Sequence, residues 1–242
     1  MTVRSIYGET GSAASEGRRN NWMSDPAPVA AVPAPAAPTA TIPWDARLAR
    51  YLVRPLSKGP IRPNHLTTVR LAFGLAGAFV LARGTYAAMN VGALLIVLSN
   101  FLDHADGELA RMSGKGSRLG HWYDLASDAL VTILLFSGMG LGAGVTHPRI
   151  FGFSPLALGI VAGIAVALIF LLRMSIENVG GKAASKQGAL AGFETEDALY
   201  LLPLVTLCDG AAAFVAAAAI GAPLFAIWVL RQYYRIMRAP PQ

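Results

Sequence analysis

Charged side chains are scarce in this sequence. Asp, Glu, Lys and Arg make up 14% of its 242 residues, whereas soluble domains average about 25%. Hydrophobic residues make up 54%, and the mean hydropathy is +0.48. This balance excludes a mostly disordered chain, which needs low hydrophobicity and high charge, and it argues against a water-soluble protein.

Cysteine is nearly absent, because Cys208 is the single one. This excludes an internal disulfide and any metal site built from several cysteines. Negative charge is also in deficit, since 14 acidic residues stand against 20 basic ones, for a net charge of +6. Because the basic excess accompanies long apolar runs, we expect anionic membrane lipids as partners and no nucleic acid.

The first 43 residues differ from the rest. Six prolines fall between residues 26 and 43, in a stretch made almost entirely of Ala and Pro. Proline breaks helices and removes a donor from sheets, so we predict a disordered tail over residues 1–43. Residues 44–65 then mix apolar side chains with basic ones at helical spacing, namely Arg47, Arg50 and Arg54. We predict a cytoplasmic amphipathic juxtamembrane helix over 44–65, with a solvated basic linker as the alternative.

Six apolar segments follow, each close to the ~20 residues that cross a ~30 Å hydrocarbon core. Runs of this length cross as helices, because a helix pairs its own backbone groups. We therefore predict an all-α integral membrane protein, with six transmembrane helices in a domain over residues 66–238. The segments are 66–82, 87–102, 125–145, 155–172, 190–207 and 211–230.

The distribution of basic residues supports this count. With six crossings and both termini in the cytoplasm, 18 of the 20 Lys and Arg residues lie on the cytoplasmic side, and only Arg83 and Arg149 lie opposite. The positive-inside rule produces such an asymmetry. We expect a bacterial inner membrane as the location.

Four aspartates lie where the second segment ends and the third begins, at Asp103, Asp106, Asp124 and Asp128. Residues three or four apart share a helix face, so two adjacent helices would point two carboxylates each at one spot. Two Mg²⁺ or Mn²⁺ ions would balance the four charges, and such a pair suits phosphoryl transfer. The alternative is a set of helix-end carboxylates in contact with water and lipid headgroups. We expect Glu108, on another face of the helix than Asp106, to be solvated.

The same region carries a longer pattern. Residues 103–111 read DHADGELAR, and residues 120–128 read GHWYDLASD. Together they resemble the signature of CDP-alcohol phosphotransferases, D-x2-D-G-x2-A-R-x8-G-x3-D-x3-D, at all eight fixed positions. The resemblance covers roughly residues 63–234. It implies six helices around a polar cavity, and transfer of a substituted phosphoryl group, with phosphatidyl as the expected one, from a CDP-linked donor such as CDP-diacylglycerol to an alcohol. The reaction releases CMP and belongs to phospholipid biosynthesis.

The resemblance also implies roles for single residues. The four aspartates are similar to the family's metal ligands, and Asp128 is similar to the base that takes the proton of the acceptor hydroxyl. A second set is similar to donor-binding residues: Asn64, Thr67, Gly107, Ala110, Arg111, Ser117 and Gly120. Thr67 has helix capping as an alternative role, and Arg111 has that of a positive-inside anchor. Weaker candidates for binding the acceptor are Lys182, Glu196 and Asp197.

The acceptor alcohol stays open. Relatives that use glycerophosphate usually read D-P-x-A-D-K where this chain has DLASDA (residues 124–129), which disfavours that acceptor. A soluble CDP-alcohol with a lipid acceptor is the mirror possibility. Other function classes are an intramembrane prenyltransferase, which also uses paired Asp motifs and Mg²⁺, and a non-enzymatic ion-coupled transporter. The short spacing from Asp106 to Asp124 disfavours the first, and the second does not explain the Ala-Arg and Gly positions. We also expect a homodimer.

Overall fold

The computed structural model describes residues 44–114, 117–185 and 199–238, and it describes side chains over 47–114, 117–176 and 199–238. Within these ranges the chain is helical apart from turns and a single β-bridge between Ile150 and Phe153. The all-α prediction therefore holds for the described residues, while the predicted tail over 1–43 lies outside them. The elements are α1 (Trp44–Val53), the 3₁₀ helix η1 (Leu56–Lys58), α2 (Pro63–Leu81), α3 (Tyr86–Ser113), α4 (Arg118–Thr146), α5 (Pro155–Ser185), α6 (Leu202–Leu207) and α7 (Ala211–Arg238).

Helix α2 is the common neighbour of α3 and α4. It contacts both neighbours extensively, whereas α3 and α4 barely touch each other. The sequence predicts instead that the two helices carrying the aspartates are direct neighbours. Glycine makes the observed packing possible, because a methyl group on Gly138 of α4 would overlap the backbone carbonyl of Ala78 in α2. Small residues let membrane helices approach backbone to backbone in this way.

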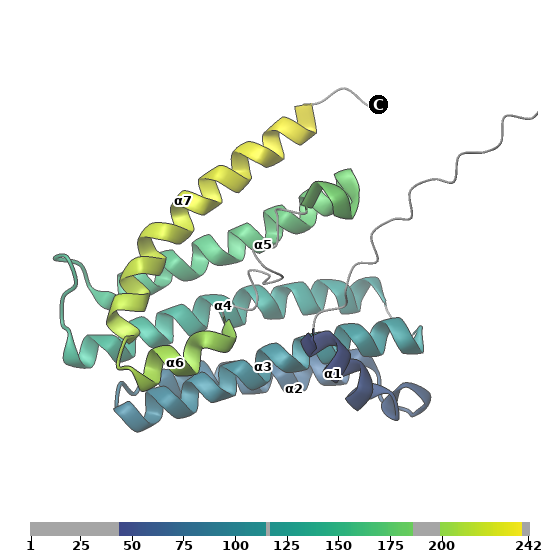
Figure 1. Cartoon of the computed structure of the whole chain (residues 1–242), viewed down its shortest axis with the longest axis horizontal. Coiled ribbons are helices and arrows are strands. Elements are labelled where there is room, and N and C mark those ends of the chain that lie inside the picture. Colours follow the sequence, from purple (N-terminus) through teal and green to yellow (C-terminus); the bar gives the residue numbers. More distant parts are fainter. Residues whose placement is uncertain (1–43, 115–116, 186–198, 239–242) are drawn as a thin grey trace, which may run out of the picture. The chain divides into compact units, whose positions relative to one another are not determined.

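Helices α4, α5 and α7 continue the bundle in that order (Figure 1). Helix α5 packs on α4 through Gly159, where an added Cβ would overlap the carbonyl of Phe136. On its other side α5 meets α7 in a small apolar core formed by Ala165, Ile169, Ile176, Ala226 and Val229. A larger core joins α2, α3 and α4 to α6 and the start of α7, and it includes Leu81, Ile96, Leu135, Leu202 and Val215.

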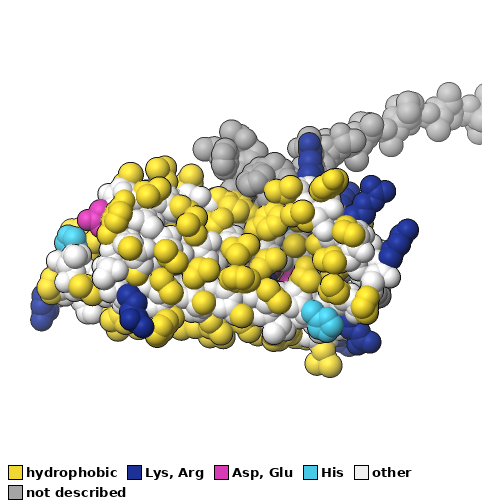
Figure 2. Space-filling view, turned by 90° about the horizontal axis from the view of Figure 1, so that it is seen from below, with side chains coloured by type: hydrophobic (Ala, Val, Ile, Leu, Met, Phe, Trp, Pro, Cys, Tyr) yellow, Lys and Arg dark blue, Asp and Glu magenta, His cyan; other side chains and the backbone are white. Residues whose placement is uncertain are grey.

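The surface of the bundle suits lipid. Hydrophobic side chains cover the middle of the face seen in Figure 2, and Lys and Arg side chains lie toward its ends. Four helices are long and apolar enough to cross a membrane, namely α3, α4, α5 over Pro155–Ile176, and α7. Large apolar side chains are exposed on the helices, such as Phe79, Leu94, Ile164 and Leu224. These features indicate an integral membrane protein.

Two of the six predicted spans do not correspond to helices that are long and apolar enough to cross a membrane. Helix α2 is 19 residues long but contains a buried arginine, Arg70. Helix α6 has six residues, which span about 9 Å at 1.5 Å per residue. The predicted fifth segment, 190–207, falls partly outside the described residues. Four helices of the described residues therefore have the length and composition of membrane spans, and the count of six remains a prediction.

The juxtamembrane helix is shorter than its predicted range. Helix α1 ends at Val53, because Pro55 and Pro60 follow and proline does not continue a helix. Its residues Ala49 and Val53 are buried in a core with Ala105 and Leu109 of α3. Its other apolar side chains, Leu48, Tyr51 and Leu52, are exposed.

Candidate active site

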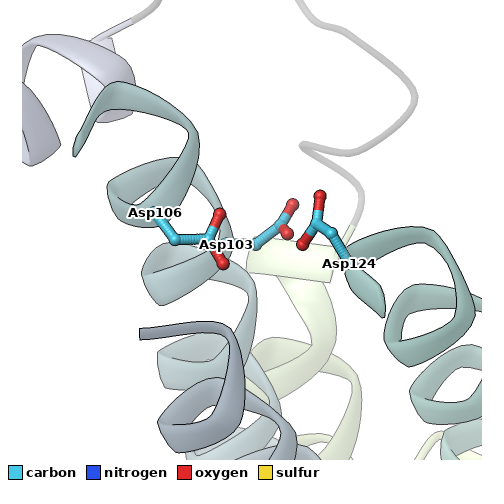
Figure 3. A group of neighbouring side chains, drawn as sticks. All are labelled: Asp103, Asp106 and Asp124. Atoms are coloured by element: carbon cyan, nitrogen blue, oxygen red, sulfur yellow. The ribbon is translucent and has the colours of Figure 1, made fainter. Parts of the chain in front are cut away.

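The aspartates converge in space, as their spacing predicts. Asp103 and Asp106 project from α3 and Asp124 from α4, and their carboxylates point toward one another (Figure 3). One carboxylate oxygen from each of the three lies within 4.8 Å of the others. The fourth aspartate, Asp128, follows one turn after Asp124 on α4 and joins the group through a shared arginine partner.

That partner, Arg70 of α2, was missed by the sequence-based reasoning, which counted it only among the cytoplasmic basic residues. Its side chain is 2% exposed and contacts all four aspartates. Nη1 lies 2.8 Å from Asp103 Oδ1 and 2.6 Å from Asp128 Oδ1. Nη2 lies 2.8 Å from Asp124 Oδ1, and Nε lies 3.6 Å from Asp106 Oδ2. The signal that could have found it is a charged residue inside an apolar helix, three positions after Thr67.

Charge explains why an arginine lies here. Four carboxylates in a membrane helix bundle repel one another and lose hydration, and a buried ion needs a partner of opposite sign. The planar guanidinium offers five donors in a fixed fork, so Arg70 reaches carboxylates on α3 and on α4 at once. The five side chains together carry a formal charge of −3. The cluster therefore keeps a strong attraction for further cations.

Neighbouring hydroxyls hold the cluster in place. Thr67, predicted to bind the donor or to cap the helix, is 2% exposed and donates from Oγ1 to Asp106 Oδ2 at 2.8 Å. Its longer contact to the carbonyl of Pro63 is 3.3 Å, and a hydroxyl has one proton to donate, so the carboxylate is the partner. Ser99 of α3 donates to the backbone carbonyl of Arg70 at 2.8 Å. Thr67 thus supports an aspartate.

Access to the aspartates is graded. The Asp106 side chain is 5% exposed and that of Asp103 is 24% exposed. On α4 the values rise to 35% for Asp124 and 42% for Asp128. Asp128 is thus the carboxylate that an incoming molecule reaches most readily, and Asp106 is the deepest.

A pocket of about 570 Å³ lies beside the start of α2 and α4, lined by Pro60, Arg62, Asn64 and Ser117. Two of these residues, Asn64 and Ser117, are predicted donor-binding residues. Gly120, another predicted donor-binding residue, is adjacent to the pocket, because a Cβ added to it would lie 2.6 Å from Asn64 Oδ1 and 3.0 Å from Ser117 Oγ. The Ser117 hydroxyl accepts a hydrogen bond from the Gly120 N–H at 3.0 Å and caps α4. Any larger residue at Gly120 would narrow this space.

The remaining predicted donor residues follow the second aspartate on α3. Gly107 has open space where a side chain would be, with Arg111 Nη2 at 3.7 Å as the nearest neighbour of an added Cβ. Ala110 is half-buried. The Arg111 side chain is 62% exposed and forms an ion pair with Glu108 at 2.9 Å.

Glu108 is not solvated, contrary to the sequence-based expectation. It is 2% exposed, because α1 covers the face of α3 on which it lies. Glu108 does lie on another face of α3 than Asp106, as its spacing predicts. The spacing of residues within one helix does not show which element packs on that face. The predicted acceptor residues are not placed: the side chain of Lys182 is outside the described side chains, and Glu196 and Asp197 lie outside the described residues.

A family comparison agrees with this geometry. The model of the CDP-alcohol phosphatidyltransferase family matches residues 61–234, which include α2, α3, α4 and nearly all of α7. The chain belongs to the CDP-alcohol phosphatidyltransferase family. The predicted resemblance is thereby confirmed.

Curated relatives in this family match over part of the chain. A bifunctional IPC transferase and DIPP synthase of Rubrobacter xylanophilus is 33% identical over 98 residues, which are 40% of this chain and 22% of that protein. A putative cardiolipin synthase of Mycobacterium tuberculosis is 37% identical over 92 residues, 38% of this chain and 37% of that protein. The chain therefore matches well under half the length of these relatives.

Solved structures share the fold over a longer stretch. The phosphatidylinositol phosphate synthase PgsA1 of Mycobacterium tuberculosis with CDP-DAG bound superposes with a TM-score of 0.59 at 17% identity, covering 82% of this chain and 99% of that one. The same enzyme in complex with manganese and citrate gives the same TM-score over 81% of this chain and 93% of that one. At this identity the likeness shows a common fold.

The aspartate cluster fits a divalent metal. Carboxylate oxygens are the ligands that Mg²⁺ and Mn²⁺ prefer, and one such oxygen from each of three aspartates lies within 4.8 Å of the other two, close enough to share one ion. The residual negative charge of the cluster also favours binding of a divalent cation. Asp103, Asp106 and Asp124 are the residues that would hold it.

Proposed function

We propose that this protein is a membrane CDP-alcohol phosphotransferase that transfers a phosphatidyl group from CDP-diacylglycerol to an alcohol and releases CMP. The observation that carries the proposal is the convergence of the signature's four aspartates beside the pocket that Asn64 and Ser117 line. Family membership supports the reaction class. The PgsA1 structure with CDP-DAG supports the donor, since the fold is shared.

The reaction needs one bond to form and one to break. The acceptor oxygen bonds to the phosphorus that carries the diacylglycerol, the bridging P–O bond of the diphosphate breaks, and CMP leaves. The acceptor's proton goes to a carboxylate. Asp128 suits this role, because it is the last aspartate of the signature and the most exposed of the four. Here a divalent metal, when bound, neutralises phosphate charge and polarises the phosphoryl oxygens.

Two ions are proposed rather than one. With Arg70 included, one divalent ion leaves the cluster at −1 and two bring it to +1. A diphosphate donor brings about two further negative charges, so the two-ion state is the one that accommodates it. In this charge balance Arg70 counts as one fixed cation among the aspartates.

The donor's cytidine is assigned to the pocket near Asn64, Ser117 and Gly120. The pocket opens at the same end of α2 and α4 as the aspartates, so a nucleotide there has its diphosphate within reach of Asp124. Gly107 leaves space on the α3 side, and Arg111 can pair with phosphate oxygens through its remaining donors. The acceptor and the homodimer remain proposals, as do six spans, cytoplasmic termini and the bacterial inner membrane.

Release of CMP tests the proposal. Purified protein in lipid nanodiscs receives CDP-diacylglycerol, Mg²⁺ or Mn²⁺, and a panel of alcohols that includes inositol phosphate, glycerophosphate, serine and choline. The expected result is CMP together with one new phospholipid, identified by mass. Asp209→Asn is the matched control for Asp128→Asn, since Asp209 is exposed between α6 and α7 in a left-handed conformation that Asn also adopts.

The outcome separates the proposal from its rivals. CMP release with a new phospholipid in the control but not in Asp128→Asn supports a phosphotransferase. Release of inorganic diphosphate from a prenyl diphosphate, with CMP absent, would favour the prenyltransferase. If well-folded protein gives neither product but carries ions across a vesicle membrane, the transporter becomes the better interpretation.

A further inference from the structure

Glu108 is a buried charge that the proposed chemistry does not use. Its carboxylate lies on the face of α3 opposite Asp106, in the interface with α1, and it is 2% exposed. Acidic side chains are rarely buried to this degree unless they are paired.

Both oxygens of Glu108 have an arginine partner. Arg50 of α1 donates from Nε to Oε2 at 3.0 Å, and Nη2 of Arg111 lies 2.9 Å from Oε1. The two arginines come from different helices, and Glu108 bridges them. Below this bridge the apolar side chains of Ala49, Val53, Ala105 and Leu109 form a small buried core. The bridge therefore closes the α1–α3 interface at its polar edge.

The bridge also orients Arg111. One nitrogen of its guanidinium is held by the buried carboxylate, while 62% of the side chain is exposed. A long side chain on a surface otherwise samples many rotamers, which costs entropy when it binds a ligand. A planar guanidinium fixed at one corner presents its other donors in a set direction. Fixing Arg111 beforehand reduces that cost for an anion.

We propose that Glu108 is a positioning residue, which holds Arg111 toward the donor's phosphates and ties this position to the docking of α1 through Arg50. This inference rests on the proposed function, since it takes a CDP-linked donor as the anion. On this view α1 contributes to the donor site through Arg50, whose partner is Glu108 and not one of the aspartates.

Three charge-neutralising substitutions, and the double variant of two of them, test the role at the donor. In Glu108→Gln the amide keeps the size, but both charged contacts are lost and the amide NH₂ faces one of the two arginine donors. We expect the donor KM to rise about tenfold, equivalent to ~1.4 kcal/mol, with kcat within about twofold of wild type, because ground-state binding is what changes. Arg50→Gln should act in the same direction, and the double variant should be less than additive. Arg54→Gln, which removes the same charge at an exposed position of the same region, should keep the wild-type KM.

Thiol reactivity tests the docking of α1 without any substrate. The chain has one cysteine, Cys208, so Cys208→Ser gives a background free of thiols. Val53→Cys places a thiol at a position that is 2% exposed, and Tyr51→Cys places one at a position that is 75% exposed. Glu108→Gln should speed modification at position 53 by about tenfold or more, as expected if α1 opens more often, and leave position 51 unchanged.

The two readouts together decide the matter. A raised donor KM and faster modification at position 53, both absent in Arg54→Gln, support the proposal. A wild-type KM in Glu108→Gln overturns the role at the donor, and unchanged protection of position 53 overturns the link to α1. If no CDP-linked donor yields CMP, the proposed function fails and the donor role fails with it, while the thiol reaction still decides whether Glu108 anchors α1.

Discussion

Replacement of Arg70 by methionine is the sharpest perturbation that the structure offers. The variant keeps an unbranched side chain of similar length and removes the cation from among four aspartates. Three close contacts are lost, at 2.6, 2.8 and 2.8 Å, and the carboxylates are left to repel one another. The Asp106 side chain, 5% exposed, has the least access to water in compensation.

The expected cost follows from the burial of the site. A charged hydrogen bond contributes about 1.5–3 kcal/mol, but removal of Arg70 also recovers its own desolvation cost. Breaking a buried ion pair on one side costs a net of about 3–5 kcal/mol. At roughly 2–4 °C per kcal/mol for a chain of this size, the unfolding midpoint of Arg70→Met should fall by roughly 6–20 °C.

Thermal unfolding in detergent, with and without Mn²⁺, is the assay. The matched control is Arg83→Met, just beyond the C-terminal end of α2, where the guanidinium lies over the Phe79 ring at 4.9 Å and is exposed. That variant should lose about 1 kcal/mol or less. Mn²⁺ should raise the midpoint of Arg70→Met more than that of wild type, because the ion replaces a missing cation. An Arg70→Met midpoint equal to that of Arg83→Met, with no extra response to Mn²⁺, would refute the counter-ion role.

Three further substitutions have distinct expected results. Asp128→Asn should abolish CMP release while donor binding, measured by titration calorimetry, stays within about threefold of wild type; near-normal turnover would rule out Asp128 as the base. Gly120→Ala should raise the donor KM at least about tenfold, since its methyl group meets Asn64 Oδ1 at 2.6 Å, and an unchanged KM would show that the cytidine binds elsewhere. Gly138→Ala should lower stability by about 1–3 kcal/mol by forcing α4 off the Ala78 carbonyl, and an unfolding midpoint equal to wild type would show that the helices separate at no cost.

The pairing of the aspartates on each of the two helices could be predicted because it depends on spacing alone. Asp103 and Asp106 are three positions apart and Asp124 and Asp128 are four apart, so each pair shares a face whatever surrounds the helices. The donor-binding candidates Asn64 and Ser117 followed from the family resemblance. The burial of Thr67 could not be predicted from the sequence, because a threonine near a helix start is as compatible with a cap as with a buried hydrogen bond.

The environment of that cluster could not be read from the sequence. Helix α2 separates α3 from α4 because of contacts between residues far apart in the chain, such as Gly138 with Ala78. For the same reason Arg70 counted as one more cytoplasmic charge, and Glu108 counted as solvated. Both are buried because another helix covers them, which periodicity within one helix does not reveal.

A phosphorus label on the lipid side of CDP-diacylglycerol tests the phosphotransferase role most directly. With purified protein, Mg²⁺ and the acceptor found in the screen, the account predicts that all released label is found in the new phospholipid, with one unlabelled CMP formed for each, and that Asp128→Asn forms neither. Label released in the nucleotide or as free phosphate would contradict it, and so would CMP formed at the same rate without an acceptor.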